Sequence, residues 1–253
     1  MSSTRSGPRL STPKEHGGLV TLGAAGLLAT AVSPEPLRAL VAAGLFLVAF
    51  LARGPTERRT RGFRPRPWDL GALFIYGLAG AGATFALAQT NVALAASAAV
   101  LAAALIAGGA IAQQRRIHRS LGIELLGMAS AGLAAGLAIV IGGGTAGLAA
   151  IVAFSMITYA CSSVLVVRAQ LRKLSSQTVG AYNWMGLCAI AIGAAIASGY
   201  EPFLFLVFAP RCAYIGYRNF VPARPSSPYM VAASETAQLA LFAVGIAVVI
   251  AVA

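Results

Sequence analysis

Residues 53–66 read RGPTERRTRGFRPR, the longest polar interruption in an otherwise apolar chain. The stretch holds six arginines and a single glutamate. Arginine is costly to carry across a bilayer, so such a segment stays on the cytoplasmic face and fixes the direction of the helices that flank it. It therefore predicts a cytoplasmic loop between two membrane-spanning helices.

The composition of the whole chain is typical of a polytopic membrane protein. Of its 253 residues, 58% are hydrophobic and only 10% are charged. The apolar runs approach the ~20 residues that cross a hydrocarbon core of roughly 30 Å. The net charge of +12 is carried by residues between these runs rather than along one face. This distribution favours positive-inside loops on anionic membrane lipid over a nucleic-acid partner.

Prolines, glycines and polar loops divide the chain into nine predicted spans. Residues 1–15 are polar, basic and rich in Ser and Pro, so we expect a disordered cytoplasmic tail before a transmembrane domain over 16–253. The expected helices cover approximately 16–32, 36–52, 69–89, 92–112, 121–141, 145–167, 179–198, 201–217 and 230–252.

The basic residues predict how these spans are oriented. With the N-terminus inside, the tail and the loops after the second, fourth, sixth and eighth spans hold seventeen Lys and Arg, whereas the outside loops hold only Arg38. A miscounted span would scramble this asymmetry. The sequence thus predicts an all-α transmembrane bundle of nine spans, with the N-terminus cytoplasmic and the C-terminus outside.

The small residues and the cysteines are expected to serve close packing between helices. Gly132 and Gly136 form a GxxxG pair, which lets helix backbones approach closely in a membrane. The three cysteines, all in apolar segments, form no CxxC pair, so we expect neither a disulfide framework nor a metal site. No P-loop or haem motif is present, and we expect no cofactor.

Ionisable residues inside or near the spans are the candidate functional groups, because charges at such depth are expensive unless they are paired or face a wet cavity. Arg211 and Glu235 lie about equally far from the loop between their helices, so we expect a buried ion pair across that hairpin.

A second set of ionisable residues lies at the cytoplasmic ends of the expected helices. We interpret it as the rim of a polar chamber, because the planar guanidinium of arginine suits phosphate or carboxylate groups. Charges that simply extend to the membrane interface are the alternative. The candidate ligand-binding residues are Arg53, Arg58, Arg119 and Arg168, and the candidate catalytic, proton-handling residues are His16, Glu15 and Glu124.

Two short motifs resemble a known family. Residues 13–17 read PKEHG, and residues 119–128 read RSLGIELLGM. They are similar to the PKEHG signature and the ELLGM-type helix start of the YwiC-like family of bacterial integral membrane proteins. The resemblance implies a multi-pass protein of the bacterial inner membrane.

The predicted architecture also resembles the UbiA-type prenyltransferases, in which aspartate-rich loops hold magnesium on a prenyl diphosphate. The resemblance is one of span number and loop placement. This chain departs from that pattern, since it offers Glu57 and Asp69 but no DxxxD, and residues 168–178 contain no acid. The sequence therefore lacks the carboxylates of the usual magnesium site, although arginines can bind an anionic head group directly.

Three classes of function stay open on the sequence. The chain is expected to bind, and as a UbiA-like transferase to transform, an anionic lipid or isoprenoid-type ligand in a cytoplasm-facing chamber. The alternatives are a small-anion transporter and a non-catalytic accessory protein that helps to assemble a membrane complex with a protein partner.

Overall fold

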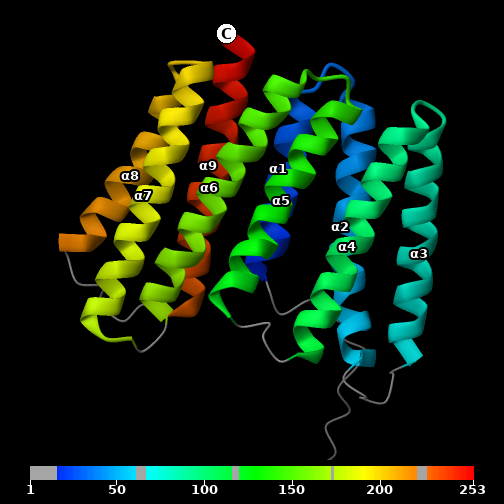
Figure 1. The fold of residues 1–253 in the computed structure, drawn as a ribbon, viewed down its shortest axis with the longest axis horizontal. Helices are drawn as coiled ribbons and strands as arrows, with labels where there is room; N and C mark the ends of the chain where they lie inside the picture. The colour runs from blue at the N-terminus through cyan, green and yellow to red at the C-terminus, as the bar shows by residue number, and fades with distance from the viewer. Residues whose placement is uncertain (1–15, 61–66, 116–119, 172–173, 221–226) are drawn as a thin grey trace, which may run out of the picture.

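The computed structural model describes residues 16–60, 67–115, 120–171, 174–220 and 227–253. These residues form a helical bundle without strands in the described ranges (Figure 1). In chain order the helices are α1 His16–Val32, α2 Pro36–Thr60, α3 Pro67–Ala88, α4 Val92–Gln114, α5 Leu121–Ile141, α6 Ala146–Leu171, α7 Ser176–Tyr200, α8 Leu204–Phe220 and α9 Pro228–Val252. The predicted all-α class is therefore confirmed.

Most of these helices have the dimensions of membrane spans. Seven described helices, α2 to α7 and α9, are long and apolar enough to cross a bilayer. The apolar part of α1, Gly18–Val32, is shorter, and α8 has 17 residues with Arg211 and Arg218 among them. The chain is a polytopic membrane protein, while the nine spans and their orientation stay predictions.

The ends of the helices follow from local chemistry. Ser120, Ser175 and Ser227 cap α5, α7 and α9, each accepting a hydrogen bond from a backbone N–H three residues on. At the other end of α5, the turn after Ile141 contains Gly143 with φ of +79°, a conformation that glycine adopts without strain. Helix α5 thus spans Leu121–Ile141, the range expected for it.

Helix α2 differs from the expectation, because it runs on to Thr60 instead of ending at Ala52. Pro55 lies inside it, so no backbone N–H at this position can donate to the Leu51 carbonyl, and the Thr56 hydroxyl donates to the next carbonyl, that of Ala52, at 2.8 Å. The following Arg and Glu residues are good helix formers, so the helix can continue into the basic segment. Part of the predicted arginine loop is therefore helical.

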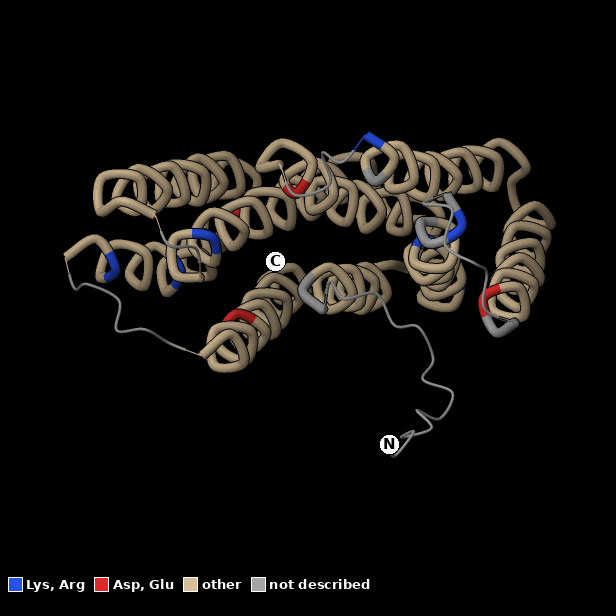
Figure 2. The backbone as a smooth tube through the Cα atoms, turned by 90° about the horizontal axis from the view of Figure 1, so that it is seen from below, with Lys and Arg blue, Asp and Glu red and all other residues tan. Residues whose placement is uncertain are grey.

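Consecutive helices are antiparallel neighbours, so the C-terminal end of one helix lies beside the N-terminal end of the next (Figure 1). The last turns of α2, α4, α6 and α8 and the first turns of α3, α5, α7 and α9 lie at one end of the bundle, which we call the basic end. The described basic residues at this end include Arg53, Arg59, Arg115, Arg168 and Arg218. Figure 2 views the bundle from this end, with the terminal helices α1 and α9 side by side on one face.

The tightest packing lies between α5 and α6. A Cβ placed on Gly132 would lie 2.7 Å from the carbonyl oxygen of Ala153, and one on Gly136 would lie 3.0 Å from that of Ala149. Only glycine allows this approach, as the GxxxG pair predicts. The contact fixes α6 against α5, so that the ends of both helices at the basic end lie close together.

Candidate functional site

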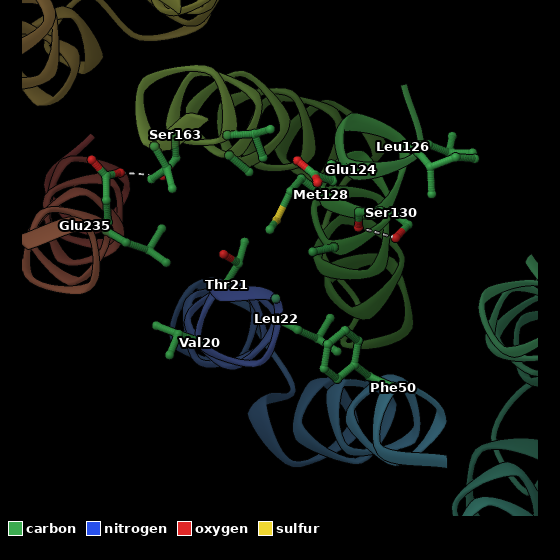
Figure 3. A pocket seen from close by; sticks show the side chains of 18 of the residues that line it. Val20, Thr21, Leu22, Phe50, Glu124, Leu126, Met128, Ser130, Ser163 and Glu235 are labelled. Atoms are coloured by element: carbon green, nitrogen blue, oxygen red, sulfur yellow. Dashed lines mark hydrogen bonds between the residues drawn. The ribbon is translucent and has the colours of Figure 1, made fainter. Parts of the chain in front are cut away.

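A cavity of about 610 Å³ lies among α1, α2, α4, α5, α6 and α9. Most of its wall is apolar, built from residues such as Leu22, Phe50, Leu105, Met128 and Leu239. Figure 3 shows side chains from α1, α2, α5, α6 and α9 on this wall. The polar residues on the wall are Thr21, Arg53, Glu124, Ser130, Tyr159, Ser163, Arg168, Glu235 and Thr236.

The outer polar layer of the cavity is built on an ion pair between α5 and α6. The Nε of Arg168 donates to Oε2 of Glu124 at 2.6 Å, and the side chains are 8% and 31% exposed. Glu124 lies in the first turn of α5 and Arg168 in the last turn of α6. Each charge therefore also meets the favourable end of its own helix dipole.

Arg53 lies on the same wall and reaches it from α2. Its half-buried side chain lies directly over Gly109 of α4, where an added Cβ would be 2.3 Å from Nε. One turn earlier, Phe50 lies over Gly18 of α1, where a Cβ would be 2.9 Å from Cζ. The position of Arg53 thus depends on a glycine in the neighbouring helix.

An inner polar layer surrounds Arg211 and Glu235, whose side chains are 2% and 10% exposed. The guanidinium makes a bidentate contact, with Nη1 to Oε1 at 3.0 Å and Nη2 to Oε2 at 2.9 Å. It also donates to Oε1 of Gln238 at 2.7 Å, and Ser163 of α6 donates to Glu235. The structure thus brings the predicted pair into contact and links it to α6.

Two aromatic rings complete the surroundings of Arg211. Its guanidinium carbon lies 5.0 Å from the ring centroid of Tyr159 and 5.5 Å from that of Tyr214, within the range of cation–π attraction. The Tyr159 ring stacks on Phe242 at 4.5 Å between centroids. Glu235 lines the cavity whereas Arg211 does not, and the Glu235 carboxylate is held by Arg211 and Ser163.

The two layers lie at different depths from the basic end. Glu124 is three residues from the start of α5, roughly 5 Å along the axis at 1.5 Å per residue. Glu235 is seven residues from the start of α9, roughly 10 Å along its axis. On the predicted spans, the outer layer would lie near the head-group region and the inner one within the hydrocarbon.

The candidate residues from the sequence fall into three groups, the first of which is the Arg211–Glu235 pair of the inner layer. Arg53, Glu124 and Arg168 lie on one cavity wall, although they come from three helices. Glu15 and Arg119 lie outside the described residues, as do the side chains of His16, the first residue of α1, and Arg58 in α2.

Sequence reasoning missed Ser163, Tyr159 and Gln238. The available signal was a run of polar residues in the middle of α6: Ser155, Thr158, Tyr159, Ser162 and Ser163.

Charged side chains of both signs lie on the cavity wall. Among the described residues these are Arg53 and Arg168 with Glu124 and Glu235, and Arg211 pairs with Glu235 from outside the wall. The wall itself thus carries two cations and two carboxylates. Within the same described ranges, no group of three or more His, Cys, Asp or Glu comes together as metal ligands would.

Comparisons with known proteins bear on the two resemblances. No curated protein and no solved structure matches the chain, and the UbiA-like arrangement stays a prediction. A family model described as YwiC-like protein matches residues 12–141, just over half of the chain. The match includes both PKEHG and ELLGM, and it covers α1 to α5 with Arg53 and Glu124. The chain therefore belongs to the YwiC-like family.

Proposed function

We propose that this protein binds an anionic amphiphile, a lipid or isoprenoid-type molecule, in the cavity, from the cytoplasmic side of the bacterial inner membrane. The anionic head would lie at the outer polar layer, and the hydrocarbon would fill the apolar part. The observation that carries the proposal is the convergence of Arg53, Arg168 and Glu124 on the wall of one large, mostly apolar cavity.

The size and chemistry of the cavity support this proposal. Small-molecule sites are concave, mostly apolar and roughly 300–1,000 Å³ in volume, with a few polar groups that orient the ligand. The cavity of about 610 Å³ lies within that range. Arg168 is held by Glu124, which pre-organises its guanidinium for a second, anionic partner. Arginine can also bind phosphate or carboxylate in a bidentate manner.

A proton-handling role for the site rests on Glu124, the described member of the candidate set. Its carboxylate lies on the cavity wall and accepts a hydrogen bond from Arg168. A chemical step would require this carboxylate to reach the bound ligand, as general acid–base catalysis demands. Glu124→Gln would then abolish turnover of a ligand that the variant still binds.

Mass spectrometry of the molecules that copurify in mild detergent tests the binding proposal. Wild type would be compared with Arg53→Ala and with Arg59→Ala, a matched control that removes the same charge from the exposed surface of α2. We expect one amphiphile to be enriched in wild type and control and to be reduced on the order of tenfold in Arg53→Ala, as the loss of one charge-assisted hydrogen bond predicts.

Two other outcomes would contradict the proposal. Bulk membrane lipid in the same proportions in all three preparations would refute selective binding and favour the accessory role. Equal losses in Arg53→Ala and Arg59→Ala would show a general attraction of anionic lipid to the basic end rather than a site in the cavity.

A further inference from the structure

The cavity extends around α5 instead of stopping at it. Its wall includes Glu124 and Met128 and also Leu126 and Ser130, which lie on other sides of the same helix. Figure 3 shows Met128 directed toward α1 and Leu126 directed away from it. The first half of α5 thus has cavity on more than one side.

On its α4 side, the cavity reaches the outer surface of the bundle. Leu126 and Leu133 line the cavity and are nevertheless 67% and 52% exposed. Leu101, Leu105 and Gly108 line the cavity from α4, which neighbours α5. We call the opening between these residues and Leu126, Gly127 and Leu133 the α4–α5 port.

Two glycines keep the port wide. A Cβ on Gly108 or on Gly127 would meet no atom within 4 Å, so neither glycine is required by close helix packing. Both lie on the cavity wall. This contrasts with Gly132, further along α5, where the backbone of α6 leaves no room for a side chain.

The depth of the port determines what meets it. Leu126 and Leu133 are five and twelve residues from the start of α5, roughly 8 to 18 Å along its axis. The hydrocarbon core of a bilayer is about 30 Å thick, so an opening at this depth faces acyl chains and not water. At the basic end of the port, Arg53 lies over Gly109, the neighbour of Gly108.

We infer that the α4–α5 port admits the hydrocarbon chain of a single-chain anionic amphiphile directly from the bilayer, while the head group stays at Arg53. This inference rests on the proposed function, and it adds the route by which the ligand enters and the shape of that ligand. Charge at one end of an apolar opening fits a carboxylate or phosphate on one long chain, because the head remains at the interface as the chain slides in.

Photolabelling with palmitic acid that carries a diazirine near the middle of its chain tests the route. The protein would be held in lipid nanodiscs, with unlabelled palmitate as competitor. Gly127→Trp plugs the port, and Gly122→Trp is its matched control, since Gly122 lies on the same helix with equal open space but off the cavity wall. Gly108→Leu is a second, smaller plug from α4.

The port predicts competable labels on residues 101–108 and 126–133. It also predicts that both plugs reduce labelling about tenfold, the change expected when a few methylene groups lose their burial, while Gly122→Trp labels like wild type. Elution as one symmetric peak in size-exclusion chromatography establishes that each variant is folded.

The failures of the two proposals differ. Labelling that depends on Arg53 and is unchanged by both plugs would overturn the port and leave the proposed function standing. Labelling that unlabelled palmitate does not compete and Arg53→Ala does not reduce would overturn both.

Discussion

The ion pair between Arg211 and Glu235 makes a sharp prediction about stability. Both side chains are nearly inaccessible, and the guanidinium holds α9 through Glu235 and Gln238 and approaches Ser162 of α6 at 3.4 Å. We consider three changes: Arg211→Met, Glu235→Leu and the double variant. Each replaces a charge by an apolar side chain of similar length, so that the lost interaction outweighs any cavity.

The structure predicts unequal costs for the two single variants. In Arg211→Met the carboxylate keeps only the Ser163 hydroxyl, so a buried charge is left without its cation, which costs about 3–5 kcal/mol. In Glu235→Leu the guanidinium keeps Gln238 and the rings of Tyr159 and Tyr214. We therefore expect a smaller cost of about 2 kcal/mol, near that of losing a hydrogen bond to a charged group.

The double variant isolates the interaction. With both charges removed, neither partner is left unpaired, so we expect a free energy of unfolding within about 1–2 kcal/mol of wild type. The coupling free energy in the double-mutant cycle is then about 3 kcal/mol or more. Equilibrium unfolding by SDS in mixed micelles, followed by circular dichroism, measures all four proteins under one condition.

Additivity would refute this reasoning. If the double variant lost the sum of the two single costs, the pair would contribute nothing as a pair, and the effects would come from packing alone. A cost below about 1 kcal/mol for Arg211→Met would likewise contradict a buried pair, because exposed ion pairs have that value.

Three further predictions follow from individual contacts. Gly109→Ala should displace Arg53 without removing its charge and so weaken ligand retention as Arg53→Ala does; retention equal to wild type would contradict the assigned position. Gly132→Ala should lower the free energy of unfolding, whereas Gly127→Ala should raise it by about 0.5–1 kcal/mol. Changes of the same sign in the two variants, measured by SDS unfolding, would contradict this reasoning. A reporter enzyme active only outside the cytoplasm should work when fused after Ala253, and an inactive fusion would overturn the predicted orientation.

The helices themselves could be predicted from the sequence because their ends have local causes. Ser120 caps α5, and the glycine turn beyond Ile141 ends it, so both bounds follow from neighbouring residues. The end of α2 could not be predicted in this way. A Gly54–Pro55 step normally indicates a break, whereas here the helix continues to Thr60 through the helix-forming residues beyond it.

The convergence of Arg53, Glu124 and Arg168 lies beyond single-sequence reasoning. Span boundaries place all three near one end of the bundle, but helices that are apolar on every side carry no pattern that fixes their rotation. Rotation is set instead by close approaches between helices, such as that of Gly132 to the backbone of Ala153. The same argument applies to Ser163, whose contact with Glu235 depends on where α6 faces α9.

The inner ion pair bears on where the proposed anionic ligand would rest. Glu235 belongs to the cavity wall, and both of its oxygens are already held by Arg211 and Ser163. A second anion brought beside this carboxylate would be repelled in a medium of low dielectric constant. The cations on the wall, Arg53 and Arg168, belong to the outer layer, so the proposal puts the head group there. The chain then has two apolar directions available, inward beside Leu239 or sideways through the α4–α5 port, and the second needs no polar group to be passed.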